Sequence, residues 1–266
     1  KLYQVSIIDS VKKVSNGEHP KTPLVIDLDP TTFCDLACPE CISASVLQNG
    51  KFTHNQLIKL ANDFVKMGVK AVILIGGGEP LLHNSTPIIS KILSDNNIHI
   101  GVVTNGTMIM QRFEILSNLV KWTRVSVDAA TEKTYNFFRP SKNSNPKFEK
   151  IIQGISKLTK VSIGKVGFSF LILRRKVQNS YHTNVHEIFQ AAKLAKNIGC
   201  DYFELKHSFD QQHFLEEFSD SIYSIIKSEI KKSKMLECES FKVYINSSLN
   251  YTLNNNNSYK RFQINL

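Results

Sequence analysis

The sequence lacks long apolar runs and any segment resembling an export signal. No hydrophobic run approaches the roughly 20 residues of a membrane-spanning helix, and the longest candidate, residues 71–75, ends in three glycines. Residues 1–10 have neither the long apolar centre nor the small-residue cleavage site of a secretory signal. We therefore expect a cytoplasmic protein without a membrane segment.

Cysteine is also scarce, and its distribution is informative. The chain has only five cysteines, an odd number that argues against a disulfide framework. Cys34, Cys38 and Cys41 fall within eight positions, while Cys200 and Cys238 stand alone. This clustering indicates metal ligation in a reducing compartment.

Acidic residues are outnumbered by basic ones, with 33 Lys and Arg against 23 Asp and Glu, for a net charge of +10. An excess of positive charge favours anionic partners such as phosphates, nucleotides or nucleic acid. Lysine-rich stretches such as residues 227–234 are also typical of solvated helix faces, which is the alternative explanation of the charge. With 42% hydrophobic and 21% charged residues, the composition is that of a globular protein.

Short β-rich runs alternate with amphipathic helical stretches between residues 24 and 207, which predicts an α/β fold with a mainly parallel sheet. Right-handed connections between such units favour a barrel or an open half-barrel. Residues 53–68 predict a helix with Thr53 as N-cap and Gly68 as its end, and residues 186–198 predict another. The six predicted strands are residues 24–28, 71–75, 99–104, 124–127, 166–173 and 202–206.

The pattern divides the chain into a leader (1–23), a core (24–207) and a short α+β C-terminal extension (208–266). In the extension we expect a helix over 214–234, a strand over 241–245 and a polar turn over 254–257. Because chemistry-bearing residues concentrate before residue 210, we expect function to lie in the core.

The three clustered cysteines have the spacing Cys-x3-Cys-x2-Cys and directly follow the first predicted strand. The loops at that end of a parallel β/α barrel carry catalytic residues. A structural zinc site closes with four protein ligands, whereas three cysteines on a four-iron cluster leave one iron open to a small molecule. Zinc completed by His54, Cys200 or another distant residue is the alternative.

This loop resembles the motif of the radical S-adenosylmethionine (radical SAM) superfamily, and residues 24–207 resemble its partial (β/α)6 TIM-like barrel. The resemblance implies an enzyme with a 4Fe–4S cluster on Cys34, Cys38 and Cys41 that reductively cleaves S-adenosylmethionine. The resulting 5′-deoxyadenosyl radical would abstract a hydrogen atom from a substrate. An electron donor such as flavodoxin or ferredoxin is also implied.

Further motifs occur in the expected order. The segment Gly76-Gly77-Gly78-Glu79 ends the second strand and resembles the motif that holds the methionine amino group. A glycine run lets a ligand approach the backbone closely. The third strand ends in Thr104-Asn105-Gly106, where a simple turn at Asn105-Gly106 is the alternative to cofactor binding. The residues that the resemblance assigns to cofactor binding are Gly77, Gly78, Glu79, Thr104, Asn105, Ser126, Asp128, Ser169 and Arg174.

The substrate is expected to contact Arg139, Glu204 and Lys206. Positive charge favours an anionic small molecule, such as a nucleotide, a sugar phosphate or a nucleotide-linked sugar. The main rival is a peptide, because residues 134–158 resemble those of peptide-modifying members. Such members usually carry further cysteines near the C-terminus for auxiliary clusters, and only Cys238 lies there. A surface role is the alternative for Arg139.

A zinc-stabilised nucleic-acid-binding module is the weaker alternative, because no second cysteine pair at zinc-finger spacing is present. The position before the last cysteine is often aromatic in the superfamily and packs near adenine, but here it is Glu40. We expect Phe33 as a replacement for that packing.

Overall fold

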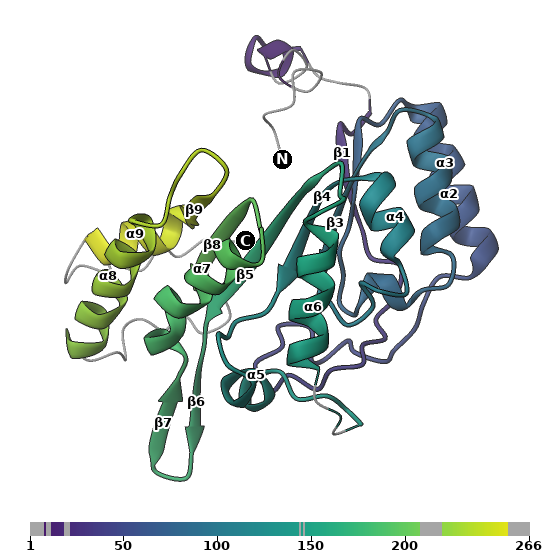
Figure 1. Cartoon of the computed structure of the whole chain (residues 1–266). Coiled ribbons are helices and arrows are strands. Elements are labelled where there is room, and N and C mark those ends of the chain that lie inside the picture. Colours follow the sequence, from purple (N-terminus) through teal and green to yellow (C-terminus); the bar gives the residue numbers. More distant parts are fainter. Residues whose placement is uncertain are drawn as a thin grey trace.

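The computed structural model describes residues 8, 12–18, 22–143, 145, 147–207 and 220–254. Seven strands in this part of the chain form one parallel sheet with the order β1-β2-β3-β4-β5-β8-β9 (Figure 1). The sheet does not close on itself, and β1 and β9 form its two edges. Its strands are β1 (Val25–Leu28), β2 (Ala71–Leu74), β3 (His99–Thr104), β4 (Val120–Ser126), β5 (Lys165–Ile172), β8 (Tyr202–His207) and β9 (Lys242–Ile245).

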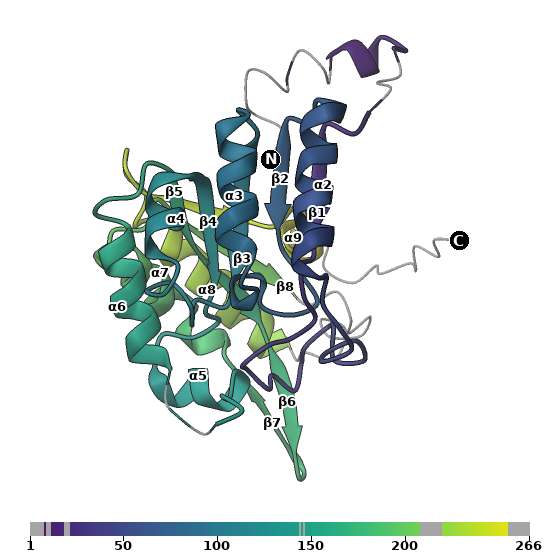
Figure 2. The same ribbon diagram turned by 90° about the vertical axis from the view of Figure 1, so that its right-hand side faces the viewer.

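Helices connect the strands and cover the outer face of the sheet, as the view turned by 90° shows (Figure 2). This arrangement is the partial barrel that the sequence predicts. Short 3-10 helices, η1 (Pro80–Leu82) and η2 (Val185–Glu187), follow β2 and precede α7. The α-helices are α2 (His54–Met67), α3 (Thr86–Asp95), α4 (Phe113–Asn118), α5 (Glu132–Phe138), α6 (Phe148–Leu158), α7 (Ile188–Asn197), α8 (Asp220–Lys234) and α9 (Ser247–Asn254).

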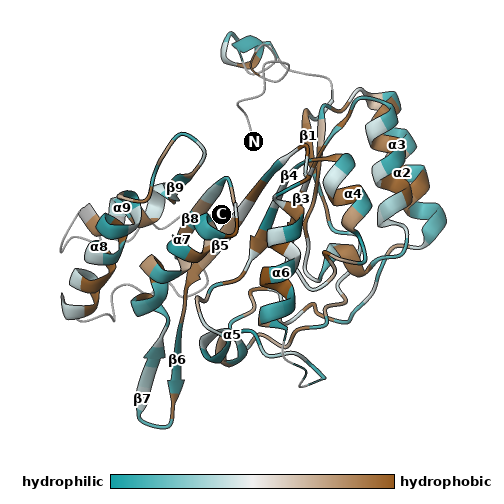
Figure 3. Ribbon diagram, viewed as in Figure 1, coloured by the Kyte–Doolittle hydropathy of each residue, from teal (hydrophilic) through white to brown (hydrophobic). Residues whose placement is uncertain are grey.

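The main core lies between the sheet and these helices. Alternate strand residues such as Val72, Val102, Phe168 and Phe203 are fully buried. The strands and the inner sides of the helices carry most of the hydrophobic colour in Figure 3, while the outer sides of the helices are hydrophilic. Because side chains alternate between the two faces of a strand, the remaining residues of each strand point into the half-barrel.

Helix α2 shows how local sequence sets its ends. The Thr53 hydroxyl accepts a hydrogen bond from the Gln56 backbone N–H at 3.3 Å, and the Gln56 side chain accepts one from the Thr53 N–H at 2.8 Å. Gly68 ends the helix with a φ of 71°, a left-handed conformation that glycine adopts without strain. Both predicted caps are confirmed.

The six predicted strands are confirmed with shifts of a few residues at their ends, but the sequence did not predict a hairpin after β5. Strands β6 (Arg174–Val177) and β7 (Ser180–Thr183) pair antiparallel as a separate two-stranded sheet. Both strands are short and polar, so they lack the apolar alternation that marks a half-buried strand. The hairpin begins where β5 ends and projects away from the main sheet (Figure 1).

The C-terminal region also differs from the prediction. Strand β9 confirms the predicted strand and extends the main sheet beside β8. Helix α8 begins at Asp220, and residues 214–219 of the predicted helix lie outside the described residues. Asn254 ends α9, which was not predicted, and residues 255–257 of the predicted turn also lie outside them. No helix among the described residues is long and apolar enough to cross a membrane.

Candidate active site

A cavity of about 330 Å³ lies at the C-terminal ends of the strands. Its volume is at the lower end of the roughly 300–1,000 Å³ of small-molecule sites. Val103, Ser126, Leu171 and Lys206, from β3, β4, β5 and β8, reach it from the inside of the half-barrel. The cavity therefore occupies the position at which β/α barrels carry their active sites.

The cysteine loop forms one wall of this cavity. Cys34, Cys38 and Cys41 all line it, and all three thiols are free and partly accessible. Burial raises the pKa of Cys38 to about 11 and also raises the pKa of Cys34. Because metals bind the thiolate form, loading this site would release protons. The three thiols therefore form an accessible, sulfur-rich ligand set at one cavity wall.

The zinc alternative needs a fourth protein ligand, and neither His54 nor Cys200 is placed to provide it. The Nδ1 atom of His54 lies 2.9 Å from the Ser85 hydroxyl. Cys200 is buried just before β8, at the opposite end of the sheet from the cysteine loop. No three His, Cys, Asp or Glu side chains among the described residues are placed to hold a single ion. A four-iron cluster on three cysteines needs no fourth protein ligand, because its remaining iron is open to a small molecule.

The glycine turn after β2 packs against the base of the cysteine loop. The Gly77 N–H donates to the Asp29 carboxylate at 2.6 Å, and the Glu79 N–H donates to the Phe33 carbonyl at 2.8 Å. A Cβ atom on Gly78 would overlap the Phe33 carbonyl oxygen, and one on Gly76 would overlap Asp29. Close packing therefore requires glycine at positions 76 and 78. Asp29 was not predicted as a site residue, because no sequence motif marks it.

Glu79 is almost fully buried and joins the ends of β2 and β3. Its carboxylate accepts hydrogen bonds from the Leu81 N–H at 3.1 Å, the Thr104 hydroxyl at 2.7 Å and the Asn105 N–H at 2.6 Å. Burial raises the pKa of Glu79 to about 7, although these three donors favour the ionised form. Any ammonium group that Glu79 binds must therefore share the carboxylate with three protein donors.

Asn105 extends this network to the cysteine loop. Its side-chain amide donates to Asp35 at 2.9 Å and lies 3.6 Å from the Cys34 sulfur. The Thr107 hydroxyl donates to the same Asp35 oxygen at 3.1 Å. The segment after β3 therefore orients the first cysteine and does more than form a turn.

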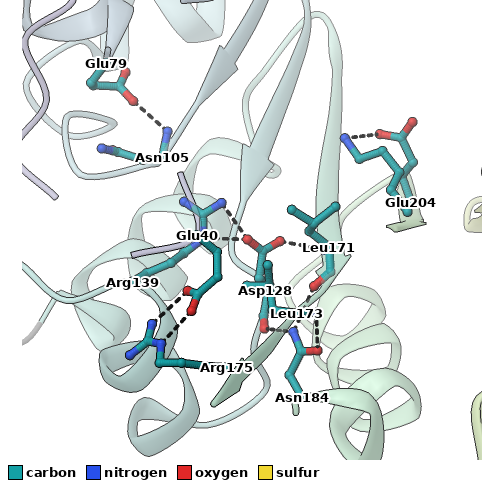
Figure 4. Close-up of polar contacts among 11 residues, drawn as sticks. Glu40, Glu79, Asn105, Asp128, Arg139, Leu171, Leu173, Arg175, Asn184 and Glu204 are labelled. Atoms are coloured by element: carbon teal, nitrogen blue, oxygen red, sulfur yellow. Dashed lines mark hydrogen bonds and ion pairs between the residues drawn. The ribbon is translucent and has the colours of Figure 1, made fainter. Parts of the chain in front are cut away.

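Asp128 and Arg139 form an ion pair at the cavity wall (Figure 4). The Asp128 Oδ2 atom accepts from Arg139 Nε at 2.6 Å and lies 2.5 Å from Nη2, while Oδ1 accepts from the Leu171 N–H at 2.7 Å. The Asp128 side chain is 2% exposed and that of Arg139 16%. Arg139 is therefore not a surface side chain, and much of its charge is committed to Asp128.

Asn184, which sequence reasoning missed, holds the backbone around Asp128 through three hydrogen bonds. Its side-chain amide donates to the carbonyls of Asp128 and Leu171, both at 2.8 Å, and its Oδ1 accepts from the Leu173 N–H at 2.9 Å. The residue is almost fully buried, and Figure 4 shows its contacts with Asp128, Leu171 and Leu173. Asp128 itself has a φ of 60°, a left-handed conformation that is uncommon outside glycine. Asn184 thus holds the backbone that presents Asp128.

The structure brings most predicted site residues to the cavity. Besides the cysteines, its wall includes Gly77, Gly78, Glu79, Thr104, Asn105, Ser126, Asp128, Arg139 and Lys206.

Ser169, Arg174 and Glu204 do not line the cavity as we expected. Ser169 and Glu204 lie two residues before Leu171 and Lys206, and therefore one level deeper in the half-barrel. Arg174 belongs to β6, where its guanidinium stacks over Tyr181 at 3.8 Å.

Phe33 does not provide the packing expected from it. The residue is 39% exposed and does not line the cavity. Phe138 lines the cavity instead, as do Glu40 and Cys41. The position before the last cysteine is thus polar, and the aromatic wall comes from the end of α5.

Comparisons with known proteins identify the family to which the sequence is similar. The family model described as Radical SAM superfamily matches residues 28–181. The AdoMet-dependent heme synthase of Methanosarcina barkeri is 28% identical over 184 residues, 67% of this chain and 48% of that protein. The GTP 3′,8-cyclase of Staphylococcus aureus is 26% identical over 147 residues, 51% of this chain and 42% of that protein.

The fold likewise matches solved structures. Streptococcus suis SuiB bound to S-adenosylmethionine superposes with a TM-score of 0.65 at 13% identity, over 91% of this chain and 54% of SuiB. This likeness supports the partial barrel. The chain spans about half the length of the curated relatives it matches.

Proposed function

Because the chain belongs to the radical SAM superfamily, which uses a 4Fe–4S cluster and S-adenosylmethionine, we propose that it abstracts a hydrogen atom from an anionic small molecule. The observation that carries this proposal is the shared cavity, in which three cysteine thiols face a glycine turn and a partly buried lysine. When bound, the cluster and S-adenosylmethionine supply the one-electron chemistry that generates a 5′-deoxyadenosyl radical. The protein's part is to bind, orient and shield the reactants.

Different walls of the cavity would bind different parts of the cofactors. Cys34, Cys38 and Cys41 would hold the cluster through their thiolates. Gly77 and Gly78 would present backbone groups to the methionine end of S-adenosylmethionine without side-chain obstruction.

The rim residues at the ends of β3 and β4 have the polar groups to orient the rest of the cofactor. Thr104 and Ser126 carry hydroxyls, Asn105 an amide and Asp128 a carboxylate held by Arg139. These assignments follow the order of the strands around the mouth of the half-barrel.

Lys206 is the residue that supports an anionic substrate. Its Nζ atom lies 3.5 Å from Glu204, whose carboxylate also accepts a hydrogen bond from Arg124 at 3.1 Å. Two cations therefore share one carboxylate, which leaves the cluster of side chains with a net positive charge. Burial lowers the pKa of Lys206, with Arg124 adding to the effect. A phosphate or carboxylate at the cavity would relieve this excess charge.

The proposal also covers the cellular compartment and the electron donor. Free thiols at the cavity wall favour a reducing compartment, so the proposal places the protein in the cytoplasm. Flavodoxin or ferredoxin is the proposed type of electron donor.

A Lys206→Met variant tests the substrate class. Losing a charge-assisted hydrogen bond costs about 1.5–3 kcal/mol, so KM for an anionic substrate should rise roughly tenfold to a hundredfold. Phosphorylated small molecules and acidic peptides should be screened by the substrate-derived deuterium they transfer to 5′-deoxyadenosine. Lys206→Arg should retain part of the binding.

The matched control is Lys165→Gln, because Lys165 forms an exposed pair with Asp201 far from the cavity. It should leave KM unchanged. Deuterium transfer from peptides alone would refute the proposed substrate class. An anionic substrate whose KM is the same in Lys206→Met as in wild type would also refute it.

A further inference from the structure

Glu40 and Arg175 form a two-pronged ion pair next to the last cysteine. Arg175 Nε donates to Glu40 Oε1 at 2.5 Å, and Nη2 donates to Oε2 at 2.8 Å (Figure 4). The two residues are 135 positions apart, and their side chains are only 10% and 20% exposed. A two-pronged pair of this kind fixes orientation as well as distance. The cysteine loop is therefore tied directly to the base of the β6–β7 hairpin.

Aromatic rings complete the junction. The Arg175 guanidinium carbon lies 4.4 Å from the centroid of the Phe137 ring and 5.3 Å from that of Phe138. The Phe137 ring also lies 5.4 Å from the ring of His182, the residue opposite Arg175 in the hairpin. Cation–π stacking holds a guanidinium plane in place. Three segments, the cysteine loop, the end of α5 and the hairpin, thus meet at one group.

The junction directly adjoins the reacting space. Glu40, Cys41 and Phe138 all line the cavity. Each oxygen of Glu40 accepts one hydrogen bond from Arg175, so the carboxylate is held in one orientation beside the last cysteine. A largely buried ion pair gives little net stability compared with apolar residues of the same shape. Its geometry is therefore a better reason for its presence than its contribution to folding.

We propose that Glu40 and Arg175 are positioning residues that hold Cys41 and the cavity wall at Phe138 in a fixed position relative to the hairpin. The inference rests on the proposed function, because it concerns a cluster bound through the three cysteines. Without the pair, the segment around Cys41 would lose its fixed attachment to the rest of the cavity wall. The cluster would then be held less firmly, and its surroundings would become heterogeneous.

A double-mutant cycle on the anaerobically reconstituted enzyme tests this role. Glu40→Gln, Arg175→Gln and the double variant should be compared by the rate of iron release to a chelator and by the EPR spectrum of the reduced cluster. We expect each single variant to release iron at least tenfold faster, with a broadened spectrum. The double variant should release iron no faster than the single variants, because both substitutions break the same contact.

Two variants sharpen the result. Arg175→Lys keeps the charge but loses the two-pronged geometry, so its iron release should fall between wild type and Arg175→Gln. Lys165→Gln removes an exposed charge at a remote pair and should match wild type.

Unchanged iron release and EPR spectra in the single variants would overturn the inference, even if their thermal stability fell. Additive effects in the double variant would also overturn it, because the two residues would then act separately. A wild-type protein that binds no iron would refute the proposed function itself. A wild type with an intact cluster and silent variants would refute only the positioning role.

Discussion

Replacing Cys38 with alanine is expected to abolish both cluster binding and S-adenosylmethionine cleavage. Cys38 is the middle cysteine of the three proposed ligands, and it lines the cavity close to the Arg139 and Asp128 pair. A 4Fe–4S cluster held by only two thiolates lacks one of the ligands that retain it. Iron and sulfide content should fall to background, and 5′-deoxyadenosine should become undetectable by mass spectrometry.

The matched control for this variant is Cys238→Ala. Cys238 is exposed and lies in a turn before β9, away from the cavity wall. This control should keep wild-type iron content and wild-type cleavage. Equal iron loss in both variants would contradict the assignment, because it would show that the metal does not depend on the cysteine loop. Full cleavage by Cys38→Ala would contradict it equally.

The second large effect is expected from Asp128→Ala. The substitution leaves the largely buried guanidinium of Arg139 without its counter-ion and the Leu171 N–H without its acceptor. Removing one partner of a buried ion pair costs about 3–5 kcal/mol. The free energy of unfolding of the metal-free protein, measured by urea denaturation, should fall by that amount.

Two comparisons separate this effect from a general loss of packing. Asp63→Ala breaks the exposed pair with Lys59 and should cost about 0–1 kcal/mol. The double variant Asp128→Ala and Arg139→Met should be more stable than Asp128→Ala alone, since it removes the unpaired charge. A cost below about 1 kcal/mol for Asp128→Ala would show that the pair is not fixed as the structure places it.

The parts that the sequence predicted well depend on local patterns. Cap residues and hydrophobic periodicity located α2, and buried apolar runs located β2 and β3. Because parallel strands end at one edge, motifs at successive strand ends had to meet, which located the cavity from Cys34, Gly78 and Ser126. Such inferences require only spacing and chain direction.

The parts that escaped prediction depend on long-range partners. Arg175 and Glu40 lie 135 positions apart, and neither position indicates its partner through spacing. Asn184 is a single polar residue whose three hydrogen bonds arise only once β4 and β5 are folded side by side. Glu204 lies below the cavity because β8 reaches the cavity wall only two residues later, at Lys206. Each of these needs three-dimensional information that one sequence does not encode in local form.

The most direct test of the central claim is anaerobic reconstitution with iron and sulfide, followed by dithionite and S-adenosylmethionine. Metal content should be measured on the reconstituted protein, and 5′-deoxyadenosine by mass spectrometry. We expect about four irons per chain and reductant-dependent formation of 5′-deoxyadenosine. Stoichiometric zinc that iron does not replace, together with no cleavage, would contradict the assignment of Cys34, Cys38 and Cys41 to an iron–sulfur cluster.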